Sequence, residues 1–135
     1  MHRIRMMTAA LLLTLPLAAQ AQAQAQEDAL DRTLNGCLNT ANTTQQMNAC
    51  YQAAITGWDA AMNQAYQQAL ARGEPARQRT LREAQRRWLS YRDAWMTASR
   101  ARFDQGTLAS VSQAVQLLML NKNQTLMLRS LQAQE

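Results

Sequence analysis

Apolar side chains recur at every third or fourth position along most of the chain, which is the period of one buried helix face. The positions between them hold mainly Ala, Gln and Arg, which form helices readily, and runs of β-branched residues are missing. The pattern therefore predicts an all-α fold, a small antiparallel bundle of three long helices plus a short N-terminal helix.

Turn and capping residues divide this pattern into four segments. Thr43 or Thr44 can cap the second helix, and Gly73 ends it. Pro75 suits the first turn of the third helix, and Thr107 can cap the fourth. The predicted helices cover residues 28–38, 44–72, 75–103 and 107–131.

An amphipathic stripe on the third helix holds three of the seven aromatic residues of the chain. The stripe consists of Leu81, Ala84, Trp88, Tyr91, Trp95 and Ala98. We expect these side chains to be buried, because apolar residues at helical spacing face the neighbouring helices. Arg79, Arg82 and Arg86 lie on the opposite face and are predicted to be solvated.

Residues 1–21 have the features of a secretory signal peptide. Arg3 and Arg5 precede an apolar run that is too short for a stable membrane span, and small residues follow it. Cleavage is predicted after Ala21, and Ala23 offers an alternative site. No cysteine closely follows the apolar run, so a membrane anchor is not expected. The predicted location is the periplasm or the outside of the cell.

The chain that follows the signal peptide has the length of one domain. Residues 22–26 alternate Ala and Gln and are predicted to form a disordered leader, and residues 27–135 a single helical domain. Loss of Arg3 and Arg5 lowers the net charge from +5 to +3. This small charge, with arginines and aromatics on opposite faces of the third helix, argues against nucleic acid as a partner.

The remaining residues give little support for catalysis. His2, the only histidine, leaves with the signal peptide, which removes the commonest general base and a usual zinc ligand. The sequence has no Gly-rich phosphate loop and no cluster of metal ligands, so no cofactor or metal is expected. Asp59 and Asp93 could face each other as a glycosidase pair, but capping and ion pairing explain them more simply. The chain is therefore interpreted as non-enzymatic.

The two cysteines, Cys37 and Cys50, allow two interpretations. In an oxidising periplasm a disulfide is the expected state, and it would join the end of the first helix to the start of the second. A reactive thiol pair is the alternative, which the absence of C-x-x-C spacing disfavours.

Two sequence segments, taken with the cysteines, resemble the LprI-type lysozyme inhibitor family of secreted bacterial proteins. The residues that carry the resemblance are Cys37, Cys50, Met62, Asn63, Tyr66, Ala84, Gln85, Trp88, Tyr91, Arg92 and Asp93. The family pattern places a third cysteine at Met96 and a fourth near Val115 or Gln116, and both are missing here. Their joint absence implies that they pair with each other in relatives, which leaves Cys37 with Cys50.

The resemblance implies a helical periplasmic protein that binds and inhibits a lysozyme-like muramidase. The inhibition would serve defence against host lysozyme or immunity to a peptidoglycan-cleaving toxin. Animal lysozymes are mostly basic, and a domain of charge +3 does not bring the negative charge that would steer it toward them. The alternative function is that of an envelope structural or accessory protein that binds peptidoglycan or an assembly.

The resemblance also directs attention to the junction between the second and third helices. We expect Arg92 to be held there by Asp59 or by a helix-end carbonyl, because half-buried polar groups need partners. The connections Gly73-Glu74 and Gln105-Gly106 are the candidate binding loops, since loops carry function more often than packed helices.

Overall fold

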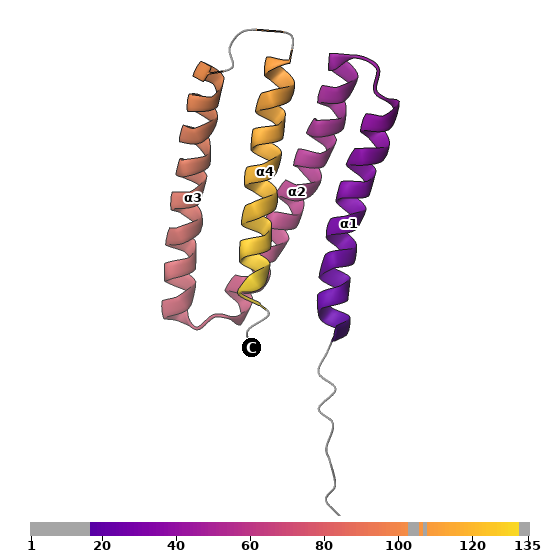
Figure 1. The fold of residues 1–135 in the computed structure, drawn as a ribbon. Helices are drawn as coiled ribbons and strands as arrows, with labels where there is room; N and C mark the ends of the chain where they lie inside the picture. The colour runs from indigo at the N-terminus through magenta and orange to yellow at the C-terminus, as the bar shows by residue number, and fades with distance from the viewer. Residues whose placement is uncertain (1–16, 103–105, 107, 133–135) are drawn as a thin grey trace, which may run out of the picture.

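Four helices make up the protein in the computed structural model, which describes residues 17–102, 106 and 108–132. They are α1 (Leu17–Thr40), α2 (Thr44–Arg72), α3 (Pro75–Arg102) and α4 (Ala109–Ser130). No strand occurs in these ranges, so the predicted all-α class is confirmed. Consecutive helices alternate in direction, and α2 and α4 therefore run parallel to each other (Figure 1). None of the helices in the described ranges is long and apolar enough to cross a membrane.

The helix α1 is longer than the sequence pattern predicts. It has 24 residues and begins at Leu17, so the expectation of a short helix from Asp28 is wrong at its N-terminal boundary. Residues 22–26, expected to form a disordered leader, are helical, because Ala and Gln extend an existing helix at little cost. Residues 1–16, which hold most of the predicted signal peptide, lie outside the described residues, and the signal peptide stays a prediction.

The predicted boundaries of the second helix are confirmed at both ends. The hydroxyl of Thr43, the N-cap residue, accepts a hydrogen bond from the backbone N–H of Gln46 at 3.1 Å. The Gln46 side chain in turn accepts the backbone N–H of Asn42 at 2.7 Å. In α4 the N-cap position is Leu108, which makes no side-chain cap hydrogen bond, and the expected cap Thr107 lies outside the described residues.

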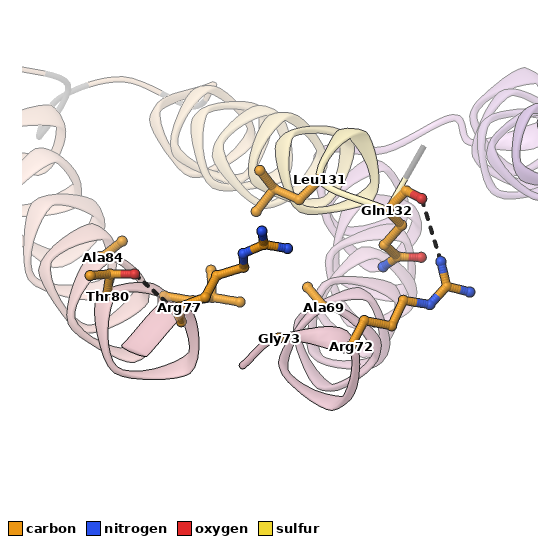
Figure 2. A pocket seen from close by; sticks show the side chains of 9 residues that line it. Ala69, Arg72, Gly73, Arg77, Thr80, Ala84, Leu131 and Gln132 are labelled. Carbon is orange, nitrogen blue, oxygen red and sulfur yellow. Dashed lines mark hydrogen bonds between the residues drawn. The ribbon is translucent and has the colours of Figure 1, made fainter. Parts of the chain in front are cut away.

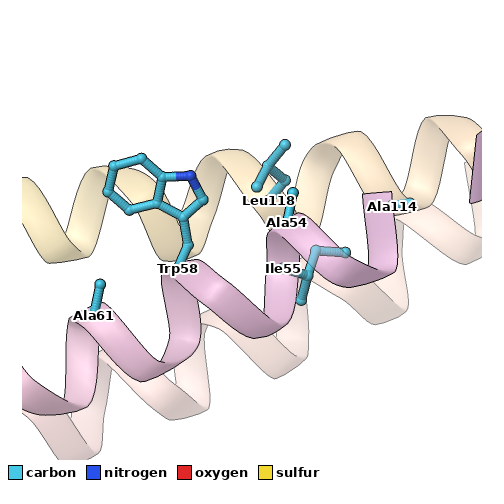
Figure 3. Packing of buried hydrophobic residues seen from close by; sticks show 6 residues of the cluster. All are labelled: Ala54, Ile55, Trp58, Ala61, Ala114 and Leu118. Carbon is cyan, nitrogen blue, oxygen red and sulfur yellow. The ribbon is translucent and has the colours of Figure 1, made fainter. Parts of the chain in front are cut away.

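The core lies mainly between α2 and α4 (Figure 3). One cluster of buried residues surrounds the fully buried Trp58, and a second one surrounds Met62. The buried positions of α4 follow each other at steps of four and three: Ala114, Leu118, Asn121, Thr125 and Leu128. This spacing is the heptad pattern of helices that pack side by side.

Two polar contacts set the register of this parallel pair. Gln132 Nε2 donates to the backbone oxygen of Ala65 at 3.0 Å. The Thr125 hydroxyl donates to the backbone oxygen of Asn121 in its own helix at 2.7 Å and lies 3.3 Å from the backbone oxygen of Trp58. Both contacts join residues that are 67 positions apart, so they lie one heptad from each other, and a slip of α4 by one residue would break both.

The helix α1 is held to this pair by packing, by charge and by a disulfide. Leu30 and Leu34 pack against the Trp58 cluster. Lys122 Nζ of α4 bonds to Asp31 Oδ2 at 2.6 Å and lies 5.3 Å from the centroid of the Trp58 ring.

The predicted disulfide between Cys37 and Cys50 is confirmed, with 5.6 Å between the two Cα atoms. It spans the turn between α1 and α2, and Cys50 is buried. The bridge therefore ties the end of α1 to the core helix α2.

Removal of this bridge by the double change Cys37→Ala and Cys50→Ala should lower the free energy of unfolding by about 3 kcal/mol, because the unfolded chain regains the freedom of the closed loop. Urea denaturation of the oxidised protein and of the variant measures the difference. The dithiothreitol-reduced protein serves as the control and should unfold close to the variant. Equal midpoints for the oxidised protein and the variant would contradict this role.

Candidate functional site

Only part of the predicted stripe of α3 faces the core. Leu81 and Trp88 are half-buried against the second core cluster, whereas Tyr91 is 53 % exposed and Trp95 45 % exposed. The buried residues of α3 are instead Gln85, Met96 and Ser99. The helix is rotated relative to the prediction, because polar side chains on its other flank make the bonds to the neighbouring helices.

The first of these polar contacts joins α3 to α4. Gln124 Nε2 donates to Gln85 Oε1 at 2.8 Å, and Trp95 Nε1 donates to Gln116 Oε1 at 2.9 Å. The bond between Trp95 and Gln116 joins α3 to α4 next to Met96 and Val115, near the positions where the family pattern has the two cysteines that are missing here. The bond also holds the Trp95 indole at the surface, 6.2 Å from the Tyr91 ring.

The second polar contact is the expected junction of α3 with α2. Arg92 Nη1 lies 3.9 Å from Asp59 Oδ1, and Arg92 Nε lies 3.4 Å from Asp93 Oδ1. The Arg92 guanidinium also lies 5.4 Å from the centroid of the Trp88 ring. The expectation that Asp59 holds Arg92 is confirmed. Both carboxylates suggested as a glycosidase pair thus contact one guanidinium, which explains them as ion-pair partners.

The other motif residues divide between the core and the surface. Met62 is buried in the second core cluster, against which Tyr66, Leu81 and Trp88 pack. Asn63 is exposed and lies within 3.4 Å of Asp59 Oδ2. Ala84 and Asp93 are exposed on α3. The motif therefore supplies a helix junction on one side and part of an exposed surface on the other.

One predicted binding loop borders a cavity of about 510 Å³ at the α2–α3 end of the bundle (Figure 2). Its lining comes from α2, α3, the connection between them and the two residues after α4, and comprises Ala69, Arg72, Gly73, Arg77, Thr80, Leu81, Ala84, Leu131 and Gln132. Arg72 Nη1 donates to the backbone oxygen of Gln132 at 3.4 Å, and the Arg77 side chain extends across the cavity toward Leu131. Guanidinium, amide and hydroxyl groups of this kind can bind a carboxylate or a backbone carbonyl. The sequence pattern does not predict this cavity, because Leu131 and Gln132 reach it only once α4 is packed beside α2 and α3.

The two predicted binding loops lie at opposite ends of the bundle. Gly73 lines the cavity and Glu74 is exposed beside it, whereas Gly106 lies at the other end of α3 (Figure 1). Gly106 has φ +107°, a conformation that favours glycine, and Gln105 lies outside the described residues. A partner that contacted both loops would have to lie along α3, which has 28 residues and so a length of about 42 Å.

Groups that could bind a metal do not gather in the part of the chain that the structure describes. No group of three or more His, Cys, Asp or Glu side chains is found within it. The candidate site is the surface of exposed aromatic and basic side chains on α3, together with the cavity at one end of this helix.

Replacement of Arg92 by Met should lower the free energy of unfolding by about 1 kcal/mol, because it removes the ion pair with Asp59 across the two helices and keeps the aliphatic stem. The matched control is Arg87→Met, since Arg87 is 81 % exposed and pairs only along its own helix with Glu83. The control should change stability by less than about 0.5 kcal/mol in urea denaturation. Equal losses in the two variants would refute a structural role for Arg92.

A family model described as "Lysozyme inhibitor LprI" matches residues 35–128. No curated protein and no solved structure matches the chain. The matched segment contains the disulfide, the junction around Arg92, the exposed aromatic residues of α3 and most of α4. The match covers more than half of the chain and includes every motif residue on which the resemblance was based, so the chain belongs to the LprI lysozyme inhibitor family.

Proposed function

We propose that the chain is a secreted, non-enzymatic inhibitor that binds a lysozyme-like muramidase. The observation that carries the proposal is the family match over residues 35–128. An inhibitor of this kind protects the cell wall either from a host lysozyme or from a peptidoglycan-cleaving toxin of a rival bacterium.

The chemistry of the candidate site supports the absence of catalysis. Catalysis of glycoside hydrolysis needs two carboxyl groups that face the scissile bond. Asp59 and Asp93 instead share the guanidinium of Arg92. Among the residues that the structure describes, the cavity is lined by Arg72, Arg77, Thr80 and Gln132 with small and apolar residues, and none of these carries a carboxylate. These groups can bind but do not form a hydrolytic pair.

The features of the chain before and around α1 support a periplasmic location. Residues 1–21 have the pattern of a signal peptide, and the disulfide between Cys37 and Cys50 suits an oxidising compartment. Cleavage after Ala21 would leave the part of α1 that packs on the core through Leu30 and Leu34. The fold would therefore survive processing at either predicted site.

The exposed aromatic residues support a protein partner. Tyr, Trp and Arg are enriched at the centres of protein interfaces, where a few residues carry most of the binding energy. Tyr91 and Trp95 lie exposed side by side on α3, and Trp95 is fixed by its bond to Gln116. Such a rigid pair loses little conformational entropy when a partner covers it.

The cavity favours a second candidate function, that of an envelope accessory protein that contacts peptidoglycan. Peptidoglycan carries carboxylates, and Arg72 lines a cavity large enough for a small anionic group. This function needs binding to the cell wall itself rather than to an enzyme.

The purified mature protein should slow the lysis of bacterial cell walls by at least one muramidase in a dose-dependent manner. Turbidity assays with c-type, g-type and bacterial lysozyme-like muramidases measure the effect. Sedimentation of the protein with purified peptidoglycan provides the control, because inhibition by mere coating of the wall would require such binding. Sedimentation with the wall and no inhibition of any muramidase would contradict the proposal and favour the accessory function.

A further inference from the structure

The positive charge of the chain is concentrated on one helix. The segment of α3 holds eight arginines and two acidic residues, which gives it a net charge of +6. The arginines are Arg77, Arg79, Arg82, Arg86, Arg87, Arg92, Arg100 and Arg102. The rest of the chain after Ala21 carries four basic and seven acidic residues, and so a net charge of −3. The net charge of +3 predicted for the mature chain is therefore the sum of a positively charged α3 and a negatively charged remainder.

The fold places these charges at the surface. Seven of the eight arginines are exposed, and only Arg92 is half-buried. Within α3, Glu83 pairs with Arg86 and Arg87. Glu83 and Asp93 are the two acidic residues of α3, so most of its arginine charge is not balanced within the helix. In Figure 1, α3 forms one edge of the bundle and α1 the opposite edge, with α2 and α4 between them.

Arginine and aromatic side chains share one exposed flank of α3. Arg87, Tyr91 and Trp95 follow each other at steps of four residues and so lie in one row. The row combines two aromatic residues with an arginine, and these residue types are enriched at protein interfaces.

We propose that the side of α3 that holds Tyr91 and Trp95 is the docking surface for an acidic partner, with Arg77, Arg87 and Arg102 on the same side of the helix. Because the proposal rests on the proposed function, it identifies the inhibited enzyme as an acidic muramidase rather than a basic animal lysozyme. A helix with a net charge of +6 attracts a negatively charged partner over about 10 Å at moderate ionic strength and repels a basic one. Charges of this kind act mainly on the association rate.

The test compares two variants whose net charge changes by the same amount. The first, Arg77→Gln with Arg87→Gln and Arg102→Gln, removes three exposed charges from the side of α3 that holds Tyr91 and Trp95. The control, Arg32→Gln with Gln45→Glu and Gln52→Glu, lowers the charge by three at exposed positions of α1 and the start of α2. Circular dichroism and thermal melts establish that both are folded.

Association and dissociation rates are measured by surface plasmon resonance against an acidic bacterial muramidase, a basic c-type lysozyme and vesicles of anionic lipid, at 25 and 300 mM salt. With the acidic muramidase we expect the α3 variant to associate about tenfold more slowly at low salt, and the control by less than about twofold. High salt should abolish the difference between them. Tyr91→Ala should instead raise the dissociation rate about tenfold.

The outcomes separate this inference from the proposed function. Binding of the acidic muramidase through α3 without inhibition of its activity would support the docking surface and overturn the proposed function. Inhibition of the basic lysozyme alone, or equal association rates for the two charge variants, would overturn the docking surface and leave the inhibitor function standing. Binding to the vesicles alone would overturn both.

Discussion

The parallel packing of α2 against α4 around Trp58 is the contact on which the other helices depend. Trp58 is fully buried, and its neighbours Ala54, Ala61 and Ala114 are small enough to let the two backbones approach (Figure 3). Thr125 then reaches the backbone oxygen of Trp58, which sets the register of α4. Once α4 is placed, its Lys122 bonds to Asp31 of α1. Its Gln116 accepts a hydrogen bond from Trp95 of α3, and its Gln124 donates one to Gln85 of α3. One large aromatic side chain thus positions helices from both edges of the bundle.

The orientation of α3 about its own axis is set by the polar side chains that contact α2 and α4. An amphipathicity argument assigns every Trp and Tyr to the core, but these residues have polar tips and are stable when half exposed. In α3 the side toward the bundle holds Gln85 and Arg92, which bond to Gln124 and Asp59. A buried amide without a partner costs more than an exposed indole, so the polar bonds prevail over the apolar stripe.

Local signals were enough to predict most of the fold. Thr43 and Gly73 mark the ends of α2 because capping acts through neighbours in the sequence, and the two cysteines could pair only with each other. The extension of α1 to Leu17 is not predictable from the helix pattern of the mature domain, because residues 17–21 belong to the signal-peptide pattern. The candidate site was harder to foresee. The contact of Arg92 with Asp59 followed from the motif, but the cavity and the exposure of Tyr91 depend on how three helices meet, which no single segment encodes.

The way α3 is attached gives the bundle an uneven local stability. A disulfide and leucine packing hold α1 on one edge, whereas α3 is held on the other edge by side-chain hydrogen bonds and little buried apolar surface. Local opening costs least where few apolar contacts are lost. We therefore expect the backbone amides of α3 to exchange with solvent through a partial opening that leaves α1, α2 and α4 folded. A partner that covered α3 would close this route, so its binding would be visible as slowed amide exchange in a single helix.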